Sequence, residues 1–276
     1  MPTDLPTATA ALPRLKGLDG GPALVPARPG WQRYWPGRPP QPCVLCGSWG
    51  RQGLCAACQA RFVGIRPAAC PRCALASPGH QVCGDCQRQP PPYTACIAAA
   101  DYGFPWDGLV GRFKFQGQPE LAGLLAAVMA GAVLRGAAGA GAAAGAATAG
   151  AAGVEVIVPV PLSDARLAER GYNQAWELAR RLAARLRLPA LANGLLRLRD
   201  TPHQVGLTRQ ARQRNLRDAM WVAPAAAAQL AGRRVALVDD VLTTGVTAAA
   251  ASQALLAAGA ASVQVWVLAR TPPPER

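Results

Sequence analysis

Eight cysteines form four C-x-x-C pairs, and pairs at this spacing can hold metal ions. Two cysteines so spaced place both sulfurs within reach of one tetrahedral ion. A disulfide framework would need an oxidising compartment, and a thioredoxin-type motif would explain one pair but not four. We therefore predict two structural zinc sites of four thiolates each. Sequential pairing is the simplest arrangement, and interleaved pairing stays open. The eight predicted ligands are Cys43, Cys46, Cys55, Cys58, Cys70, Cys73, Cys83 and Cys86.

His80 and Cys96 lie in or near this region and could also bind a metal, but we predict that neither is a ligand. His80 lies between the third and fourth pairs. Because four cysteines already complete each site, we expect His80 to be a surface loop residue. Cys96 lies in an apolar segment and is expected in the core, where free cysteine packs as a small apolar side chain.

The second candidate site is the stretch "RRVALVDDVLTTGVT", in which an apolar run ends in two acids and a threonine-rich loop. The loop offers three hydroxyls, a glycine and successive backbone N–H groups. A helix begins directly after it, so the positive end of the helix faces the same place. Such a loop can hold one phosphate, and the acids can accept hydrogen bonds from ribose hydroxyls. The predicted ribose-phosphate site comprises Asp239, Asp240, Thr243, Thr244, Gly245, Val246 and Thr247.

Two other interpretations of this stretch fit the sequence less well. The magnesium-side acid of a P-loop NTPase also follows an apolar strand, but that class needs a Gly-Lys pair, and the chain contains none. A helix N-cap needs one Asp or Thr, whereas this segment carries two acids and three threonines. A phosphate beside two acids is repelled unless its carrier also brings hydroxyls, as ribose 5-phosphate does.

The elements that must position this site alternate between strand-like and helix-like segments. Strands are expected at 94–102, 154–162, 233–240 and 262–270, and helices at 106–115, 120–134, 163–186 and 248–258. This alternation predicts an α/β domain with a parallel sheet and crossover helices. Ligands of such sheets bind beyond the carboxyl ends of the strands, where the two acids lie.

Composition divides the 276-residue chain into an arm and two domains. We predict a disordered Pro-rich arm over 1–42, a zinc module over 43–92 and an α/β domain over 93–276, with a Gly/Ala-rich loop insertion at 136–153. No secretory signal is visible, and the longest apolar segment, 121–134, is short for a membrane span. We therefore expect a cytoplasmic protein without a membrane span.

The chain is strongly basic, with a formal net charge of +14 and only two lysines, Lys16 and Lys114. A GC-rich genome explains an excess of arginine, and a polyanionic partner also explains it. Two four-thiolate zinc sites would each carry a net charge of about −2, which lowers the effective charge to about +10.

The order of these motifs resembles the ComF/GntX family, and residues 235–247 resemble the signature of type I phosphoribosyltransferases. Besides the cysteine pairs, the supporting segments are "FKFQG", "VPVPLSDARLAERGYNQ", "TPHQVGLTRQARQRNL" and "VLAR". The resemblance covers the chain from Cys43 onward. It implies a type I phosphoribosyltransferase fold: a parallel sheet flanked by helices, with a smaller hood. It also implies that the signature binds phosphoribosyl pyrophosphate (PRPP).

The resemblance places the pyrophosphate against the segment that follows the second strand. Arg166 and Arg170 can supply charge there or lie on a solvated helix start. Asn173 and Gln174 can bind the ligand or cap a turn. Arginines further along can form a cationic flap over the site or the exposed side of a helix; these are Arg209, Arg212, Arg214 and Arg217.

The resemblance implies a PRPP-binding, phosphoribosyltransferase-like protein linked to DNA uptake in natural transformation, and two compatible functions follow from it. The first is a phosphoribosyltransferase in which an acceptor, not identified by any residue, displaces pyrophosphate from PRPP with the help of Mg²⁺. The second is a non-catalytic adaptor that senses PRPP or a nucleotide and binds single-stranded DNA, since ComF relatives are associated with natural transformation and DNA uptake.

Overall fold

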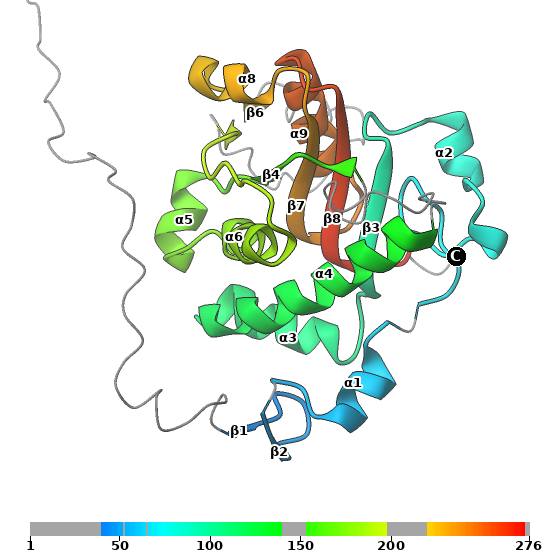
Figure 1. Cartoon of the computed structure of the whole chain (residues 1–276), viewed down its shortest axis with the longest axis vertical. Coiled ribbons are helices and arrows are strands. Elements are labelled where there is room, and N and C mark those ends of the chain that lie inside the picture. Colours follow the sequence, from blue (N-terminus) through cyan, green and yellow to red (C-terminus); the bar gives the residue numbers. More distant parts are fainter. Residues whose placement is uncertain (1–39, 52, 65, 140–152, 198–219, 274–276) are drawn as a thin grey trace, which may run out of the picture. The chain divides into compact units, whose positions relative to one another are not determined.

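A four-stranded parallel sheet forms the centre of the protein, in the order β3-β8-β7-β4 (Figure 1). The computed structural model describes residues 40–51, 53–64, 66–139, 153–197 and 220–273. The strands are β3 (Ala95–Asp101), β4 (Val156–Pro159), β7 (Arg234–Leu242) and β8 (Ser262–Arg270). All three pairings are parallel, so the four carboxyl ends meet at one edge. The predicted parallel α/β sheet is confirmed.

The sheet is buried on both faces, which explains the nearly continuous apolar runs of its strands. Along β7, Ala236 and Val238 face one core cluster, which includes α3 (Trp106–Phe115), α4 (Ala122–Gly139) and α6 (Gln174–Leu186). Val235 and Leu237 face the other cluster, which includes α8 (Pro224–Leu230) and α9 (Val246–Ala257). Helices therefore cover both faces, as expected, and α4 runs beside β3 and β8 in Figure 1.

One helix in the described part of the chain is long and apolar enough to cross a membrane by length and composition. The window spans Pro119–Gly136, and half of it is buried inside the protein. Leu125, Met129 and Val133 are almost fully buried against the sheet. Its apolar character is therefore explained by core packing. The helix also continues through Gly139, so the first residues of the predicted insertion are helical, and the insertion's residues 140–152 lie outside the described residues.

The prediction of a single helix over 163–186 is wrong in one respect, because this segment forms two helices. α5 (Asp164–Arg170) ends at Gly171, which has φ 76° and donates its N–H to the carbonyl of Leu167 at 2.8 Å. This left-handed conformation suits glycine and closes the helix. α6 then begins at Gln174, so Tyr172 lies in the turn and not on the amphipathic helix.

The cysteine-rich region consists of short elements that cannot form a large core by themselves. β1 (Gln41–Pro42) pairs antiparallel with β2 (Trp49–Gly50), and β1 holds the last two residues of the predicted arm. Between them and β3 lie α1 (Ala56–Phe62), the 3-10 turn η2 (Pro78–His80) and α2 (Gly84–Arg88). The remaining elements are η3 (Pro119–Leu121) and the small antiparallel pair of β5 (Leu196–Arg197) and β6 (Met220–Trp221).

Candidate functional site

Eight cysteines gather into two clusters, and the pairing is sequential. The first cluster holds Cys43, Cys46, Cys55 and Cys58, and the second holds Cys70, Cys73, Cys83 and Cys86. Within each cluster all four sulfurs lie within 4.8 Å of one another, and one neighbouring pair in each lies 3.6 Å apart. Four thiolates around one zinc at 2.3 Å would be about 3.8 Å apart. The clusters therefore fit two structural zinc ions.

The backbone around the clusters favours thiolates as ligands. The N–H of Cys58 points to the sulfur of Cys55 at 3.5 Å, and the N–H of Cys83 points to the sulfur of Cys70 at 3.4 Å. His80 is exposed, and its Nδ1 accepts the N–H of Ala69 at 3.3 Å, so it is a loop residue as expected. Cys96 lies buried in β3, and burial raises its pKa to about 12, which agrees with the expected core role.

The phosphoribosyl candidate site begins at the carboxyl end of β7. Asp239 and Asp240 lie on this strand, and the exposed Thr243 and Thr244 follow it. Gly245, with φ 78°, is the N-cap of α9, and no side chain caps that helix. Its first turn contains no acidic residue either. The first N–H groups of a twelve-residue helix therefore remain available for an anion.

Asp239 is a carboxyl group in an unfavourable environment. Burial and, to a smaller extent, the negative charge of Asp240 raise its pKa to about 7, although Lys114 opposes both. The N–H of Asp240 donates to Asp239 Oδ1 at 2.8 Å. In the unliganded protein the ionised form of Asp239 therefore destabilises the end of β7.

This environment makes the stability of the protein depend on pH. The folded pKa of Asp239 lies above its ordinary value of 3.8, so its stabilising effect is complete below about pH 4 and is lost as the pH rises toward 7. We expect Asp239→Asn to keep the Oδ1 acceptor and to escape this loss. Its melting temperature relative to the parent should rise between pH 5.5 and 8, as measured by thermal melts.

Asp107→Asn is a suitable control for this measurement, because Asp107 is an exposed carboxylate on α3. Comparing variant and parent at each pH cancels the titrations of groups that do not interact with Asp239. A constant difference between Asp239→Asn and the parent across this range would contradict the expectation.

Lys114 on α3 is the site residue that sequence reasoning missed. Its Nζ lies 2.8 Å from Oδ1 of the buried Asp240, and its side chain is 21% exposed. A signal was present, because an otherwise arginine-based chain keeps lysine at only two positions. Its neighbours reach the segment after β4: Phe113 contacts Tyr172 with ring centroids 5.8 Å apart, and the exposed ring of Phe115 lies 5.1 Å from the Arg170 guanidinium.

The segment after β4 lies beside the end of β7, since these two strands are neighbours. Asn173 is a structural cap: its Oδ1 accepts the N–H groups of Ala175 and Trp176, and its Nδ2 donates to the carbonyl of Val160. Arg170 Nη1 donates to Gln174 Oε1 at 3.1 Å. Arg166 is half-buried on α5.

Three buried polar atoms of this segment have no hydrogen-bond partner among the described residues. They are Ser163 Oγ, Arg170 Nε and Gln174 Nε2. Buried polar atoms without a partner are uncommon and suggest a missing ligand or water. Of the predicted pyrophosphate residues, Arg170 and Gln174 therefore lie in a suitable environment, whereas the side chain of Asn173 is used by the backbone. The predicted flap residues Arg209, Arg212, Arg214 and Arg217 lie outside the described residues.

Known proteins match both the cysteine-rich region and the α/β domain of the chain. Residues 39–87 match the double zinc ribbon domain. The chain is 35% identical over 236 residues to the DNA utilization protein YhgH of Escherichia coli (strain K12), covering 83% of this chain and 96% of the relative. It is 36% identical over 232 residues to competence protein F of Haemophilus influenzae, with the same coverage. Competence protein ComFC of Bacillus subtilis is 27% identical over 250 residues, covering 83% of this chain and 95% of the relative.

Among solved structures, the chain is similar to a glutamine PRPP amidotransferase from B. subtilis complexed with ADP and GMP. The TM-score is 0.31 and the identity 19%, and the match covers 55% of this chain and 26% of that chain.

Proposed function

Because the chain belongs to the ComF family of competence and DNA utilization proteins, we propose that it binds PRPP at the end of β7 and handles incoming single-stranded DNA. In this proposal it works in the cytosol beside the DNA-uptake machinery. PRPP supplies a 5-phosphate, ribose hydroxyls and a pyrophosphate, and in this proposal each of these groups would meet a suitable set of residues.

The observation that supports PRPP binding is that three sets of residues, each suited to one chemical group of PRPP, lie at one edge of the sheet. The 5-phosphate would bind the uncapped first turn of α9 and residues 243–247. The ribose hydroxyls would donate to Asp239 and Asp240 at the end of β7. The pyrophosphate would meet Arg170 and the unpartnered atoms of the segment after β4.

Lys114 removes a difficulty in this arrangement. Two carboxylates beside two phosphate groups would repel the ligand, but Lys114 holds one oxygen of Asp240 and offsets its charge. A carboxylate accepts several hydrogen bonds, so Oδ2 can still accept from ribose. The ion pair therefore leaves the site able to bind both hydroxyls and an anion.

The same site supports either a transferase or a sensor of PRPP. In a transferase, the acceptor attacks the anomeric carbon, pyrophosphate leaves, and the carboxylates stabilise the positive charge that develops on the ribose ring. If Mg²⁺ enters with PRPP, Asp239 and Asp240 are the carboxylates of this site that could hold it, and it would offset the negative charge of the leaving pyrophosphate. Pyrophosphate release from PRPP with a panel of nucleobases separates the two: release identifies a transferase, and binding without release identifies a sensor.

For the DNA-handling part of the proposal we expect binding that depends on charge and ignores sequence. The chain carries a net charge of +14, which favours contacts to phosphates. With roughly five phosphate contacts, affinity for single-stranded DNA should fall about a hundredfold between 50 and 200 mM salt. Fluorescence anisotropy with labelled oligonucleotides of two unrelated sequences measures this dependence.

The flap arginines provide the variant for this measurement. Replacing Arg209, Arg212 and Arg214 by Ala should weaken binding and reduce the salt dependence. A control variant with the same change in charge replaces Arg88, Arg180 and Arg234, which form exposed ion pairs. Binding that is absent at low salt, insensitive to salt, or equally reduced in both variants would contradict the expectation.

A further inference from the structure

Arg270, at the end of the central strand β8, is a buried cation that binds only carbonyl groups in the described structure. It is 7% exposed. Its Nε donates to the carbonyl of Cys73 at 2.8 Å, and its Nη1 donates to the carbonyls of Leu242 and Thr271, each at 2.8 Å. Nη1 also contacts the carbonyl of Thr243. Among the described residues no carboxylate pairs with it, so these carbonyls must offset the desolvation of its charge.

The carbonyls that Arg270 binds come from two parts of the protein with different expected roles. Cys73 is a predicted zinc ligand in the second cluster. Its turn is fixed by hydrogen bonds from the N–H of Ala74 to the carbonyl of Cys70 at 2.9 Å and from the N–H of Cys70 to the carbonyl of Leu75 at 2.7 Å. Leu242 and Thr243 instead open the loop that leads to α9. One side chain thus joins the zinc turn to the phosphate loop.

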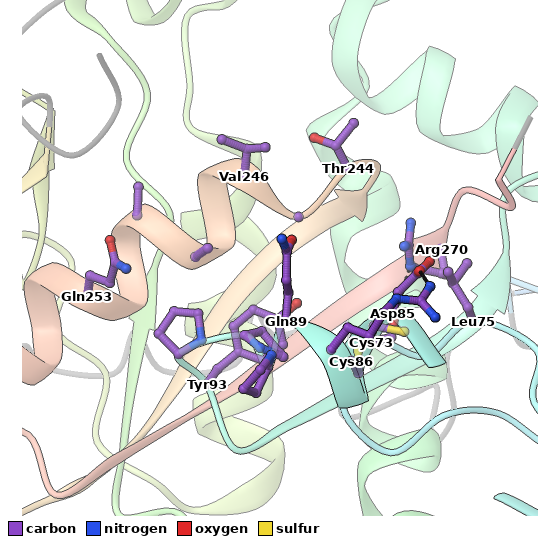
Figure 2. A pocket seen from close by; sticks show the side chains of 17 residues that line it. Cys73, Leu75, Asp85, Cys86, Gln89, Tyr93, Thr244, Val246, Gln253 and Arg270 are labelled. Carbon is purple, nitrogen blue, oxygen red and sulfur yellow. Dashed lines mark hydrogen bonds and ion pairs between the residues drawn. The ribbon is translucent and has the colours of Figure 1, made fainter. Parts of the chain in front are cut away.

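A cavity of about 800 Å³ lies at this junction and is lined by residues of both parts, including Cys86, Tyr93 and Gly245 (Figure 2). In Figure 2, Arg270 lies beside Cys73 and Cys86, with Thr244 above it in this view. The described hydrogen bonds between the zinc turn and the loop all pass through Arg270. Beside this cavity, Arg270 is the direct polar connection between the zinc turn and the phosphate loop among the described residues.

We propose that Arg270 is a positioning residue that couples zinc at the second cluster to ligand binding at residues 243–247. The inference rests on the proposed PRPP site. With zinc bound, the carbonyl of Cys73 stays in place and holds the guanidinium against the carbonyls of Leu242 and Thr243. Without zinc, hydrogen bonds alone hold the turn, so the carbonyl of Cys73 is less firmly placed, Arg270 loses a fixed acceptor, and the loop loses part of its support. Because such coupling is reciprocal, PRPP should in turn stabilise zinc at the second cluster.

The first cluster serves as an internal comparison. Cys43 and Cys58 pack in the core cluster of α3 and α4, and Arg112 of α3 donates to the carbonyl of Val44 at 3.2 Å. An influence of this cluster on the site would pass through α3, α4 and their shared core, since none of the described hydrogen bonds of Arg270 reaches this cluster. The two clusters therefore predict different behaviour when Arg270 is replaced.

The test is a double-mutant cycle that measures PRPP affinity by calorimetric titration in the presence of Mg²⁺. Arg270→Met and Cys86→Ser should each weaken binding about tenfold, and the double variant should be no weaker than either single variant. Arg270→Lys should recover part of the affinity, because it keeps the charge. Cys46→Ser, in the first cluster, should change the affinity by the same factor with Arg270 present and with Arg270→Met. Equal losses from Cys86→Ser in both backgrounds would show that Arg270 is not the connection.

A second measurement uses the full-length protein without substitutions, in case Arg270→Met fails to fold. Zinc release to a chelator is followed with and without PRPP. The inference expects PRPP to slow the release of one of the two zinc ions severalfold and to leave the other unchanged. PRPP binding with unchanged release of both ions would overturn the coupling alone, whereas absence of PRPP binding would overturn the proposed site itself.

Discussion

Each chain is expected to hold two zinc ions, and their removal by a chelator is expected to unfold residues 43–88. The core of the second cluster consists of Cys70, Cys73 and Cys86 with three partly buried neighbours, Leu75, Val82 and Cys83. Without metal these few side chains bury too little apolar surface to offset the entropy of folding. A structural zinc contributes about 10 to 16 kcal/mol to the folding of a small zinc peptide. The metal therefore supplies most of the folding free energy of the second cluster, whereas the first cluster also gains from the packing of Cys43 and Cys58 against α3 and α4.

Elemental analysis of protein prepared under reducing conditions measures the zinc content directly. We expect two ions in the parent, one in Cys46→Ser and one in Cys86→Ser. Cys96→Ala is the matched control, since Cys96 belongs to neither cluster and should leave two ions bound. A parent protein without zinc whose cysteine-rich region is still folded would show that the clusters are not structural metal sites.

Replacing Asp239 and Asp240 together by Asn is expected to weaken PRPP binding at least about tenfold, or ~1.4 kcal/mol. Asparagine still accepts hydrogen bonds but lacks the charge, and its amide adds a donor where the ribose hydroxyls already donate. Charge-assisted hydrogen bonds are roughly twice as strong as neutral ones. Titration of PRPP with Mg²⁺ into both proteins measures the loss.

The fold of this double variant should survive, and two comparisons make the result specific. Asp239→Asn removes a charge that its environment disfavours, and the Asn oxygen at position 240 can still accept from Lys114. Inorganic phosphate lacks ribose hydroxyls, so its binding should not weaken. Equal PRPP affinity in both proteins would show that the acids are not ribose ligands, and a collapse of the thermal melt would assign them a structural role.

Features that depend on local sequence were predicted well. The C-x-x-C spacing predicts shared metal ions because both sulfurs of a pair lie on one short turn. Strand β8 agrees with its predicted bounds of 262–270, because a continuous β-branched and apolar run is typical of a buried parallel strand. The acids and threonines at the end of β7 lie close together in the sequence, between residues 239 and 247, so the predicted strand alone placed them together.

Features that depend on distant contacts could not be predicted in this way. Lys114 reaches Asp240 only because α3 packs over the sheet edge, and no local pattern specifies that contact. The carbonyl groups that Arg270 binds carry no residue-type signal at all, since every residue has a carbonyl. The sequence allowed Asn173 to be either a ligand-binding residue or a helix cap. Its side chain serves as the cap because α6 begins at the next residue.

The central position of β8 has a consequence for the order of folding during synthesis. β8 pairs with both β3 and β7, and it is translated after every other strand of the sheet. Until β8 is synthesised, β3 lacks its only described partner strand, and β7 lacks one of its two partners. The cysteine module emerges much earlier and can fold around metal on the nascent chain. The sheet of the α/β domain is instead completed only when β8 is added, and apolar surface that is exposed until then favours aggregation.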